Sequence, residues 1–414
     1  MKQNNLSLLL LLVLLLFISI SCGSDSSSTA GGGSTEETLK IGILIPQSGT
    51  GPLQKEPENA CIEIAAADVN EYLMESESNK RIEAVIKDTQ FDSFAIEAAL
   101  QEFKESGIKI VVCACTSSSL AHIESYVNNN DMLLINHCST SPTLAEADNI
   151  YRLISDDDYL AVALSAIYTL KGVEKVVILY RGDVWGETQA QAIESNFNTD
   201  QGTVVQSIAY DPRSGSDEYE ARLLEVSDAI TQALTSTTAD KIAVQLISYN
   251  EGTDILEKAS EHATLGQVKW FGSDGFVQNQ DLLQNPTSAT FAAQVGMYCP
   301  ILAENSSENY QMIKAEIADD IGYEPYSWAL LLYDCYWLAS KTRAHDDYID
   351  DISAIKGIFE LQVASYEALT GTISLNNAGD RAISPYDFWA VENDNGTYFW
   401  VKSFTYNDGT LTDL

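Results

Sequence analysis

Positive charge is scarce in this sequence. Its 414 residues include 23 Lys and Arg against 60 Asp and Glu, which gives a formal net charge of −37 at pH 7. A chain of this charge repels the phosphate backbone of DNA and RNA, so we expect no nucleic-acid partner. The acidic residues are spread along the chain, so we interpret them as a solvated surface and not as a cation-binding function.

Residues that bind metals or perform catalysis are also scarce. The four His and seven Cys lack the paired spacing of a zinc site, so we expect no metal and no cofactor. The sequence has no Gly-x-Ser-x-Gly elbow, no His-Glu-x-x-His and no Gly-Lys-Ser/Thr phosphate loop. His137 beside Cys138 is the one suggestive pair, and a His packed at a strand end explains it better. We predict that the chain is not an enzyme.

No hydrophobic run is long enough to span a membrane. The longest, Leu6–Ile20, follows Lys2 and falls short of the ~20 residues that a spanning helix needs. It is typical of a signal peptide, which we place at residues 1–21. Small and apolar residues lead to Cys22 as in a lipoprotein processing site, although Ser19 stands where such sites usually have Leu. We predict a lipid on Cys22 and an extracytoplasmic, membrane-anchored lipoprotein; cleavage to a secreted protein is the alternative.

Residues 22–38 contain little that could be buried. They are rich in Ser, Gly, Thr and acid, which predicts a flexible tether. The folded part therefore begins near Leu39, and its length is sufficient for two domains or lobes.

Six cysteines follow Cys22 in the sequence. Cys113 and Cys115 are expected to share one face of a strand. We expect buried thiols, and outside the cytoplasm a disulfide such as Cys115–Cys138 is an alternative that the spacing does not decide.

Strand and helix patterns alternate along most of the chain. Buried strands are expected at 39–45, 81–87, 109–113 and 132–136, with helices at 59–72, 94–106 and 119–127. The rhythm restarts after residue 158, with helices at 159–170, 187–196, 219–233 and 253–262 and strands at 175–180, 203–209, 241–247 and 269–271. This alternation predicts an α/β protein with two units, each built on a parallel sheet covered on both faces.

The C-terminal part has a different pattern. Helices are expected at 309–321, 326–342 and 349–360, and strands at 372–375, 387–391 and 398–404. The turn signals Asp394-Asn-Gly396 and Asn407-Asp-Gly409 predict two hairpins.

Polar clusters follow several of the expected strands. Because the carboxyl ends of parallel strands meet at one edge of a sheet, we expect these clusters to converge on a cleft between the two units. The clusters are Gln47-Ser48-Gly49, Thr116–Ser119, Ser139-Thr140, Trp185-Gly186, Tyr249-Asn250 and Ser273-Asp274.

With these motifs the sequence resembles the extracytoplasmic substrate-binding proteins of ABC transporters, in the class that binds branched-chain amino acids. The resemblance covers nearly all of the mature chain and depends on the order and spacing of IGILIPQSGTGP (41–52), CTSSS (115–119), LLINHCSTSPTL (133–144), YRLISDD (151–157), ILYRGDVWGE (178–187), SYNEG (248–252), FGSDGF (271–276) and GTISLNNAGDR (371–381). It implies a type I periplasmic-binding-protein fold, with two Rossmann-like lobes joined by three crossovers. Lobe 1 would comprise residues 39–155 and 299–384, and lobe 2 residues 156–298 and 385–414. The crossovers would lie near 155–156, 297–300 and 383–386.

The resemblance also implies ligand contacts from lobe 1. Ser117 matches the serine that binds the ligand carboxylate, assisted by the backbone of Ser118 or Ser119. Hydroxyls and free N–H groups at a helix N-terminus suit an anion, although a plain N-cap is the alternative. Thr140, with the carbonyl of Ser139, matches the acceptors for the ligand ammonium.

Lobe 2 would complete the site with an acid and two aromatic rings. Asp274 matches the acidic residue that faces the ammonium; it is one methylene shorter than the Glu of branched-chain binders, and a turn residue is the alternative. Trp185 matches an aromatic that closes the pocket, and Tyr249 matches another contact; core packing is the alternative for both. Gln54, or Leu53, stands where the family often has an aromatic, which argues against a strictly aliphatic ligand side chain.

We therefore predict a lipid-anchored receptor that closes on a small ligand by a hinge motion. The expected ligand is an α-amino acid, the expected partner is an ABC permease in the membrane, and the protein is expected to be a monomer. The alternatives are a ligand-sensing module that acts through a separate signalling partner, and a binder of amides or urea-like molecules.

Overall fold

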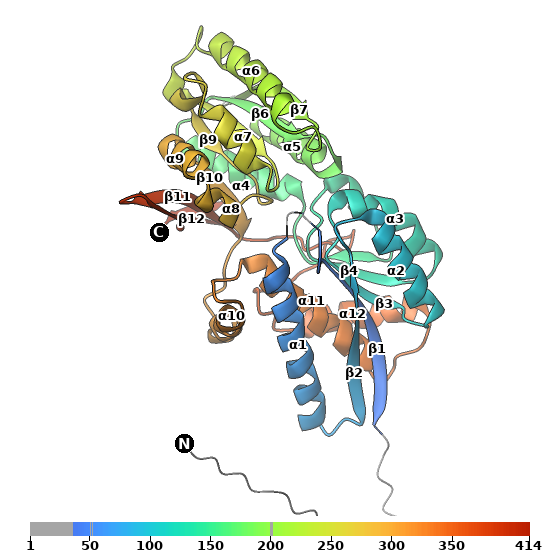
Figure 1. Cartoon of the computed structure of the whole chain (residues 1–414). Helices are drawn as coiled ribbons and strands as arrows, with labels where there is room; N and C mark the ends of the chain where they lie inside the picture. The colour runs from blue at the N-terminus through green and yellow to red at the C-terminus, as the bar shows by residue number, and fades with distance from the viewer. Residues whose placement is uncertain (1–35, 50, 52, 199–201) are drawn as a thin grey trace, which may run out of the picture. The chain divides into compact units, whose positions relative to one another are not determined.

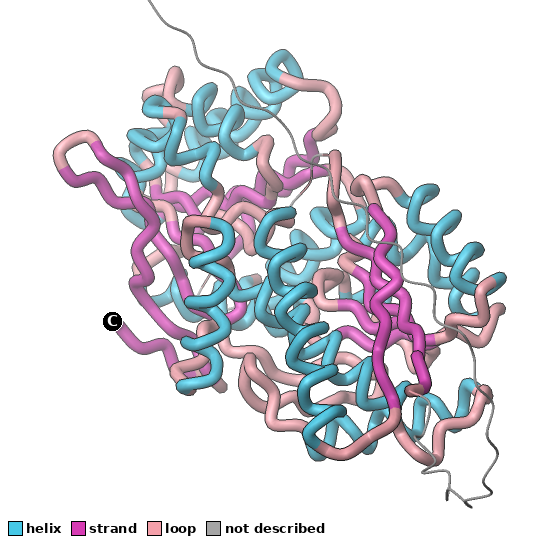
Figure 2. The backbone as a smooth tube through the Cα atoms, turned by 60° about the horizontal axis from the view of Figure 1, so that its bottom comes forward, coloured by secondary structure: helices cyan, strands magenta, loops and turns pink. Residues whose placement is uncertain are grey.

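The computed structural model describes residues 36–49, 51, 53–198 and 202–414 (Figures 1 and 2). The predicted signal peptide, the predicted lipidation site Cys22 and most of the predicted tether lie outside the described residues. The first strand begins at Glu37, two residues before the predicted start of the fold. Among the described residues, no helix is both long enough and apolar enough to cross a membrane.

The first sheet has five parallel strands in the order β2-β1-β3-β4-β5. Both of its faces are buried, because Ile41 and Ile43 of β1 pack with α1 and α11 while Leu44 packs with α2 and α3. The strands are β1 (Glu37–Ile45), β2 (Lys80–Asp88), β3 (Ile110–Cys113), β4 (Leu133–Asn136) and β5 (Ile150–Arg152). The helices of this lobe are α1 (Lys55–Glu75), α2 (Ser93–Glu105), α3 (Ser117–Asn129), α10 (Glu308–Ile321), α11 (Ser327–Ala344) and α12 (Ile352–Ser365).

The second sheet has eight strands in the order β13-β12-β11-β10-β9-β8-β6-β7. The strands from β10 to β7 are parallel, and β11 to β13 add an antiparallel edge. The strands are β6 (Lys175–Arg181), β7 (Thr203–Tyr210), β8 (Ile242–Ile247), β9 (Lys269–Phe271), β10 (Tyr298–Leu302), β11 (Tyr386–Asp394), β12 (Thr397–Asn407) and β13 (Thr410–Asp413). The helices are α4 (Asp157–Leu170), α5 (Val184–Phe197), α6 (Ser216–Ala233), α7 (Gly252–Ala259), α8 (Gln280–Gln284) and α9 (Pro286–Val295).

The two C-terminal hairpins are confirmed. Asn395 and Gly396 join β11 to β12 with φ of 53° and 91°, and Asp408 and Gly409 join β12 to β13 with φ of 43° and 82°. Two consecutive residues with positive φ are what a tight two-residue hairpin requires, and Asn-Gly and Asp-Gly adopt that conformation readily.

Three chain crossings connect the lobes, after β5, after β10 and before β11. The hydroxyls of Ser155 and Ser384 are hydrogen-bonded at 2.8 Å, so the first and third crossings lie side by side. The N–H of Ala303 donates to the carbonyl of Pro385 at 2.8 Å, which joins the second crossing to the third. The predicted fold class, two Rossmann-like lobes on parallel sheets with a three-crossover hinge, is therefore the observed one.

Two details of the predicted organisation are wrong. Residues 299–302 do not belong to lobe 1, because β10 pairs with β9 and β11 of the second sheet, and the second crossing follows Leu302. Residues 372–375 do not form a strand. The segment makes one isolated bridge, Leu375 to Arg381, and the Arg381 guanidinium holds it by donating to the carbonyls of Thr370 and Thr372 at 3.0 Å.

Candidate functional site

The N-terminus of α3 forms the lobe 1 wall of the site. Thr116 is the N-cap, and its hydroxyl accepts from the N–H of Ser119. The first N–H groups of a helix have no partner within it, so those of Ser117 and Ser118 remain available. Partial positive charge at a helix N-terminus favours an anion at this point.

The hydroxyl of Ser117 is oriented by its neighbours. Ser117 Oγ accepts from the hydroxyl of Ser139 at 3.0 Å and from the N–H of Ser141 at 3.3 Å. No described group accepts a hydrogen bond from Ser117, so its proton is available to a carboxylate. The side chain is 2% exposed, which places this donor away from bulk water.

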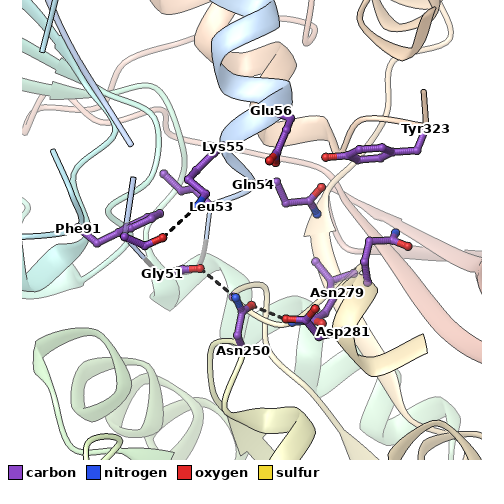
Figure 3. Close-up of a pocket in the computed structure, with 14 residues that line it drawn as sticks. Gly51, Leu53, Gln54, Lys55, Glu56, Phe91, Asn250, Asn279, Asp281 and Tyr323 are labelled. Atoms are coloured by element: carbon purple, nitrogen blue, oxygen red, sulfur yellow. Dashed lines mark hydrogen bonds between the residues drawn. The ribbon is translucent and has the colours of Figure 1, made fainter. Parts of the chain in front are cut away.

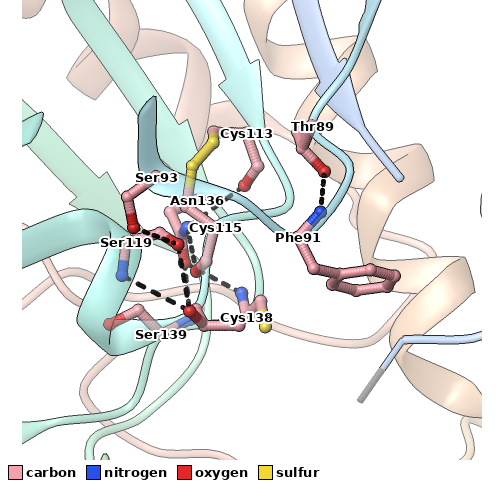
Figure 4. Close-up of a disulfide and its surroundings, with 10 residues drawn as sticks. Thr89, Phe91, Ser93, Cys113, Cys115, Ser119, Asn136, Cys138 and Ser139 are labelled. Carbon is pink, nitrogen blue, oxygen red and sulfur yellow. Dashed lines mark hydrogen bonds between the residues drawn. A yellow bond between two sulfur atoms is a disulfide. The ribbon is translucent and has the colours of Figure 1, made fainter. Parts of the chain in front are cut away.

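Asn136 at the end of β4 forms hydrogen bonds with both the loop that follows β3 and the loop that follows β4 (Figure 4). Its amide donates to the carbonyls of Cys113 and Cys115 at 3.1 and 2.9 Å, and its oxygen accepts from the N–H groups of Cys138 and Ser139 at 2.9 and 2.7 Å. Cys113 and Cys115 are joined in a disulfide, whereas Cys138 is a free buried thiol. The expectation of buried thiols is therefore wrong for these two residues, and the alternative pairing of Cys115 with Cys138 is not the observed one.

A continuous chain of hydrogen bonds links lobe 1 to the predicted acid of lobe 2. The N–H of Asp157 donates to the carbonyl of Thr140 at 2.8 Å. The amide Nε2 of Gln189 donates to Asp157 Oδ1 at 2.9 Å and to Asp274 Oδ1 at 3.0 Å. Thr140 and Asp274 therefore face the same space between the lobes.

This space holds two buried carboxylates and too few donors for them. Burial raises the pKa of Asp274 to about 6. Burial also raises the pKa of Asp157, and the charge of Asp274 raises it further. Thr140 Oγ1, Asp157 Oδ2 and Gln189 Oε1 are buried without a hydrogen-bond partner among the described residues. Such groups are costly when buried, and an ammonium carries three donors that could satisfy them.

Two stacked aromatic rings lie beside the acids. The rings of Trp185 and Tyr249 are 4.6 Å apart at their centroids and 13° from parallel. A Cβ at Gly275 would lie 2.6 Å from Tyr249 and 2.8 Å from Trp185, so only glycine allows the stack to approach the turn after Asp274 so closely. The Arg181 guanidinium lies 3.7 Å from the centroid of the Tyr249 ring.

The lobes touch each other on both sides of the site. The hydroxyls of Thr188 on α5 and Ser141 in lobe 1 are hydrogen-bonded at 2.9 Å. At the mouth of the cleft, Asn250 Nδ2 donates to the carbonyl of Gly51 at 3.2 Å (Figure 3). In this closed arrangement Thr140 is 2% exposed and Asp274 is 4% exposed.

A cavity of about 320 Å³ opens at Gly275, the residue that both stacked rings approach. Gln54 and Tyr323 line it from lobe 1, and Gly275, Asn279 and Asp281 line it from lobe 2 (Figure 3). Its wall is about equally polar and apolar, and Gly275, which follows Asp274, is part of it.

The structure brings most of the predicted site residues together. Ser117, Ser139, Thr140 and Asp274 share the network between the lobes, and Trp185 and Tyr249 lie against the turn that carries Asp274. Ser118 is half-buried at the helix N-terminus, whereas Gln54 lies apart, on the cavity wall.

Sequence reasoning missed Asp157 and Gln189. The signal for Asp157 was the run of three acids, Asp156–Asp158. One Asp is enough to cap α4, and Asp156 is that cap, so the other acids of the run need another explanation. Asp157 is fully buried. The signal for Gln189 was its position four residues after Trp185, which puts both on one face of α5.

The suggestive His137 is part of a buried pair in lobe 1. Its Nε2 lies 3.1 Å from Glu58 Oε2, and Tyr326 donates to Glu58 Oε1 at 2.5 Å. This arrangement agrees with a packed histidine. Within the residues that the structure describes, no group of three His, Cys, Asp or Glu side chains could hold a metal ion.

Comparison with known proteins gives one family and many similar folds. Residues 57–394 match the family described as the receptor family ligand binding region. An uncharacterized protein of Methanocaldococcus jannaschii is 24% identical over 389 residues, which cover 87% of this chain and 89% of that protein.

Two solved structures show the likeness of the fold. The branched-chain amino acid transporter substrate binding protein LivJ of Streptococcus pneumoniae, in complex with isoleucine, superposes with a TM-score of 0.69 at 18% identity over 88% of this chain and 100% of that one. A solute binding protein of an ABC transporter from Rhodopseudomonas palustris, in complex with 3,4-dihydroxy benzoic acid, gives a TM-score of 0.67 at 16% identity over 89% and 97%. At these identities the likeness establishes the two-lobed α/β fold.

Proposed function

Because the chain belongs to the receptor family of ligand binding regions, we propose that it captures an amino-acid-like solute and delivers it to an ABC permease. The family binds ligands and is not catalytic, which agrees with the prediction that the chain is not an enzyme. Solved proteins of the same fold include substrate-binding proteins of ABC transporters, and this supports the proposed transport role.

One observation carries the choice of ligand: a hydroxyl donor and several acceptors lie close together in the buried hydrogen-bond network between the lobes. Ser117 and the N-terminus of α3 offer hydrogen-bond donors to a carboxylate. Thr140, Asp157 and Asp274 offer acceptors to an ammonium, and two of their atoms, Thr140 Oγ1 and Asp157 Oδ2, lack partners among the described residues. An α-amino acid carries these two groups on neighbouring atoms, so one molecule satisfies both the donor and the acceptors.

The proposed mechanism is closure of the lobes around the ligand. The carboxylate docks on lobe 1 first, and the acids and rings of lobe 2 then complete the site. Only the closed state makes both sets of contacts, so the ligand shifts the population toward it. Moving the open-to-closed ratio from 99:1 to 1:99 requires about 5.5 kcal/mol of differential binding. A few hydrogen bonds to charged groups, at roughly 1.5–3 kcal/mol each, are sufficient.

The cavity beside the stacked rings would receive the ligand side chain. Gln54 and Asp281 offer it hydrogen-bonding groups that a branched aliphatic side chain would not use. We therefore favour an amino acid with a polar side chain over leucine, isoleucine or valine.

The setting of the protein is part of the same proposal. We place a signal peptide at residues 1–21 and a lipid on Cys22, so that the tether holds a monomeric binding protein at the outer face of the membrane. A lipid-tethered sensor with a separate signalling partner would use the same site. Genes for a permease and an ATPase beside this one would favour the transporter.

A thermal-shift screen tests the ligand class. The mature chain would be heated with each amino acid, with small amides and urea, and with hydroxybenzoates, because a relative of this fold binds 3,4-dihydroxy benzoic acid. We expect stabilisation by a polar α-amino acid, and none by its N-acetyl or ester derivative. Stabilisation by a hydroxybenzoate and by no amino acid would overturn the proposal, since such a ligand has no ammonium for the two acids.

A further inference from the structure

A second cavity lies in lobe 1, outside the cleft, where α1, α10 and α11 pack together. Figure 1 labels these three helices. Its volume is about 750 Å³, within the usual range of small-molecule sites. Aromatic side chains line it: the ring centroid of Trp337 lies 5.5 Å from that of Tyr72 and 6.1 Å from that of Tyr333. None of the residues predicted to contact the ligand in the cleft lines this cavity.

Negative charge surrounds the aromatic rings. The carboxylates that line the cavity are Asp68, Glu71, Glu75, Glu308 and Glu367. None of them forms an ion pair with a described residue, and no basic side chain is among the described residues of the wall. Like charges gathered at one cavity repel each other, so a cation inside it would be stabilised.

The same rings already attract a cation from the chain itself. Lys341 Nζ lies 4.5 Å from the centroid of Tyr72 and 5.8 Å from that of Trp337. Lys341 does not line the cavity, and Tyr72 remains 42% exposed, so the rings have surface left for a second cation. Attraction between a cation and an aromatic face is the usual basis for recognition of quaternary ammonium ligands.

We infer that this cavity binds a small organic ammonium ion, with Tyr72 and Trp337 against its alkyl groups and Glu71 and Glu308 neutralising its charge. A bare metal ion does not fit the chemistry, because hard cations need a cage of several oxygens and no described group of carboxylates could hold a metal ion. Aromatic rings beside carboxylates that form no ion pair with a described residue distinguish this cavity from the rest of the acidic surface.

Calorimetric titration of the mature chain with choline tests the inference. We expect saturable binding of one choline per chain. The neutral isostere 3,3-dimethyl-1-butanol has nearly the same shape and no charge, so it should bind at least about tenfold more weakly if the cation is recognised by ring faces and carboxylates. A lysine-containing peptide is titrated as a third ligand, to test whether the cavity instead binds a basic protein.

Conservative variants locate the site. Tyr72→Leu keeps the apolar volume and removes the ring, so it should weaken choline binding roughly 3- to 30-fold. The double variant Glu71→Gln with Glu308→Gln should weaken it as well, and more strongly at low salt. Glu63→Gln, exposed on α1 away from the cavity, and Ser117→Ala, in the cleft, should leave choline binding unchanged.

Several results would overturn the inference. These are the absence of saturable choline binding, equal affinity for the neutral isostere, or equal effects of Glu63→Gln and Glu71→Gln. Binding of the lysine peptide without binding of choline would also overturn it and would make the cavity a contact for a basic protein. Circular dichroism of each variant would establish that it is folded before its titration is interpreted.

Discussion

The two lobes share one architecture and present opposite chemistry to the cleft. Lobe 1 offers hydroxyls and the N-terminus of α3, which carry no charge that titrates. Lobe 2 offers Asp157 and Asp274, whose pKa values are raised because both are buried. The lobe 1 wall therefore carries no buried charge before the ligand arrives, whereas the lobe 2 wall carries a desolvation cost that a cation would relieve. The difference assigns the carboxylate of the proposed ligand to Ser117 in lobe 1 and the charge of its ammonium to the acids of lobe 2, with Thr140 of lobe 1 as a further acceptor.

Neutralising the lobe 2 acid is expected to have the largest effect. Asp274→Asn keeps the size of the side chain and removes its charge, and the loss of a buried charge partner costs about 2–5 kcal/mol, so affinity should fall at least ~30-fold. The ligand-free protein should become more stable at pH 7, because an amide avoids the desolvation of a buried carboxylate. Titration calorimetry and thermal unfolding measure the two effects.

Asp228→Asn on the exposed side of α6 is the matched control and should change neither affinity nor stability. If Asp274→Asn bound the ligand as the parent does, the acid would have no part in the site. A fall in affinity together with a fall in stability would instead indicate a structural role.

Removing one hydroxyl from lobe 1 should have the next largest effect. Ser117→Ala deletes a donor to a carboxylate, and a hydrogen bond of that kind contributes about 1.5–3 kcal/mol, so affinity should fall roughly 10- to 150-fold. Ser118→Ala is the control, because the proposed contribution of Ser118 is its N–H, which alanine retains. Equal losses in the two variants, measured by calorimetry, would contradict the proposed division between side chain and backbone.

Low pH should weaken the lobe 2 wall alone. The pKa of Asp274 in the folded chain is about 6, above that of an ordinary carboxyl. As the pH falls, this carboxylate is therefore protonated in the folded protein at a higher pH than in the unfolded chain. Affinity for an amino acid should decrease by up to about tenfold for each pH unit below 6.

The stability of the ligand-free protein should change in the opposite direction. As the pH falls from above 6 toward the unfolded pKa of about 4, protonation of Asp274 should increase the free energy of unfolding. Asp157, which shares Gln189 with Asp274, would titrate with it. Affinity that stays flat between pH 7 and 5 would contradict the assignment of the ammonium to this wall.

Much of the fold and part of the site could be predicted from local pattern. The buried strands and amphipathic helices follow from hydrophobic periodicity, and Thr116–Ser119 were identifiable because they follow a buried strand. The strand β10 was not, because Pro300 cannot donate a hydrogen bond and interrupts the strand pattern, and the family resemblance implied a chain crossing there. Pro300 is tolerated within β10 because β9 pairs with β10 only at Tyr298. At Pro300 the strand therefore has a partner only on its β11 side.

The acids were harder to predict because their role depends on contacts distant in sequence. Asp157 begins a helix, where an Asp normally stabilises the N-terminus from the surface. It is buried because α5 covers it and Gln189, 32 residues away, donates to it. The pattern shows that an acid is present; the packing of α4 against α5 decides that it faces the cleft.

The smallest predicted effect concerns neither wall but the contact that holds the lobes together. The Thr188 hydroxyl reaches Ser141 across the cleft at 2.9 Å, and a neutral hydrogen bond of this kind contributes about 0.5–1.5 kcal/mol. Thr188→Ala should therefore lower affinity only about 2- to 12-fold, by making closure less favourable while every proposed ligand contact remains. Thr188→Ser retains the hydroxyl and should restore most of the affinity. If both variants lost affinity equally, the methyl group of Thr188 and not its hydroxyl would matter, and closure would depend on packing at α5.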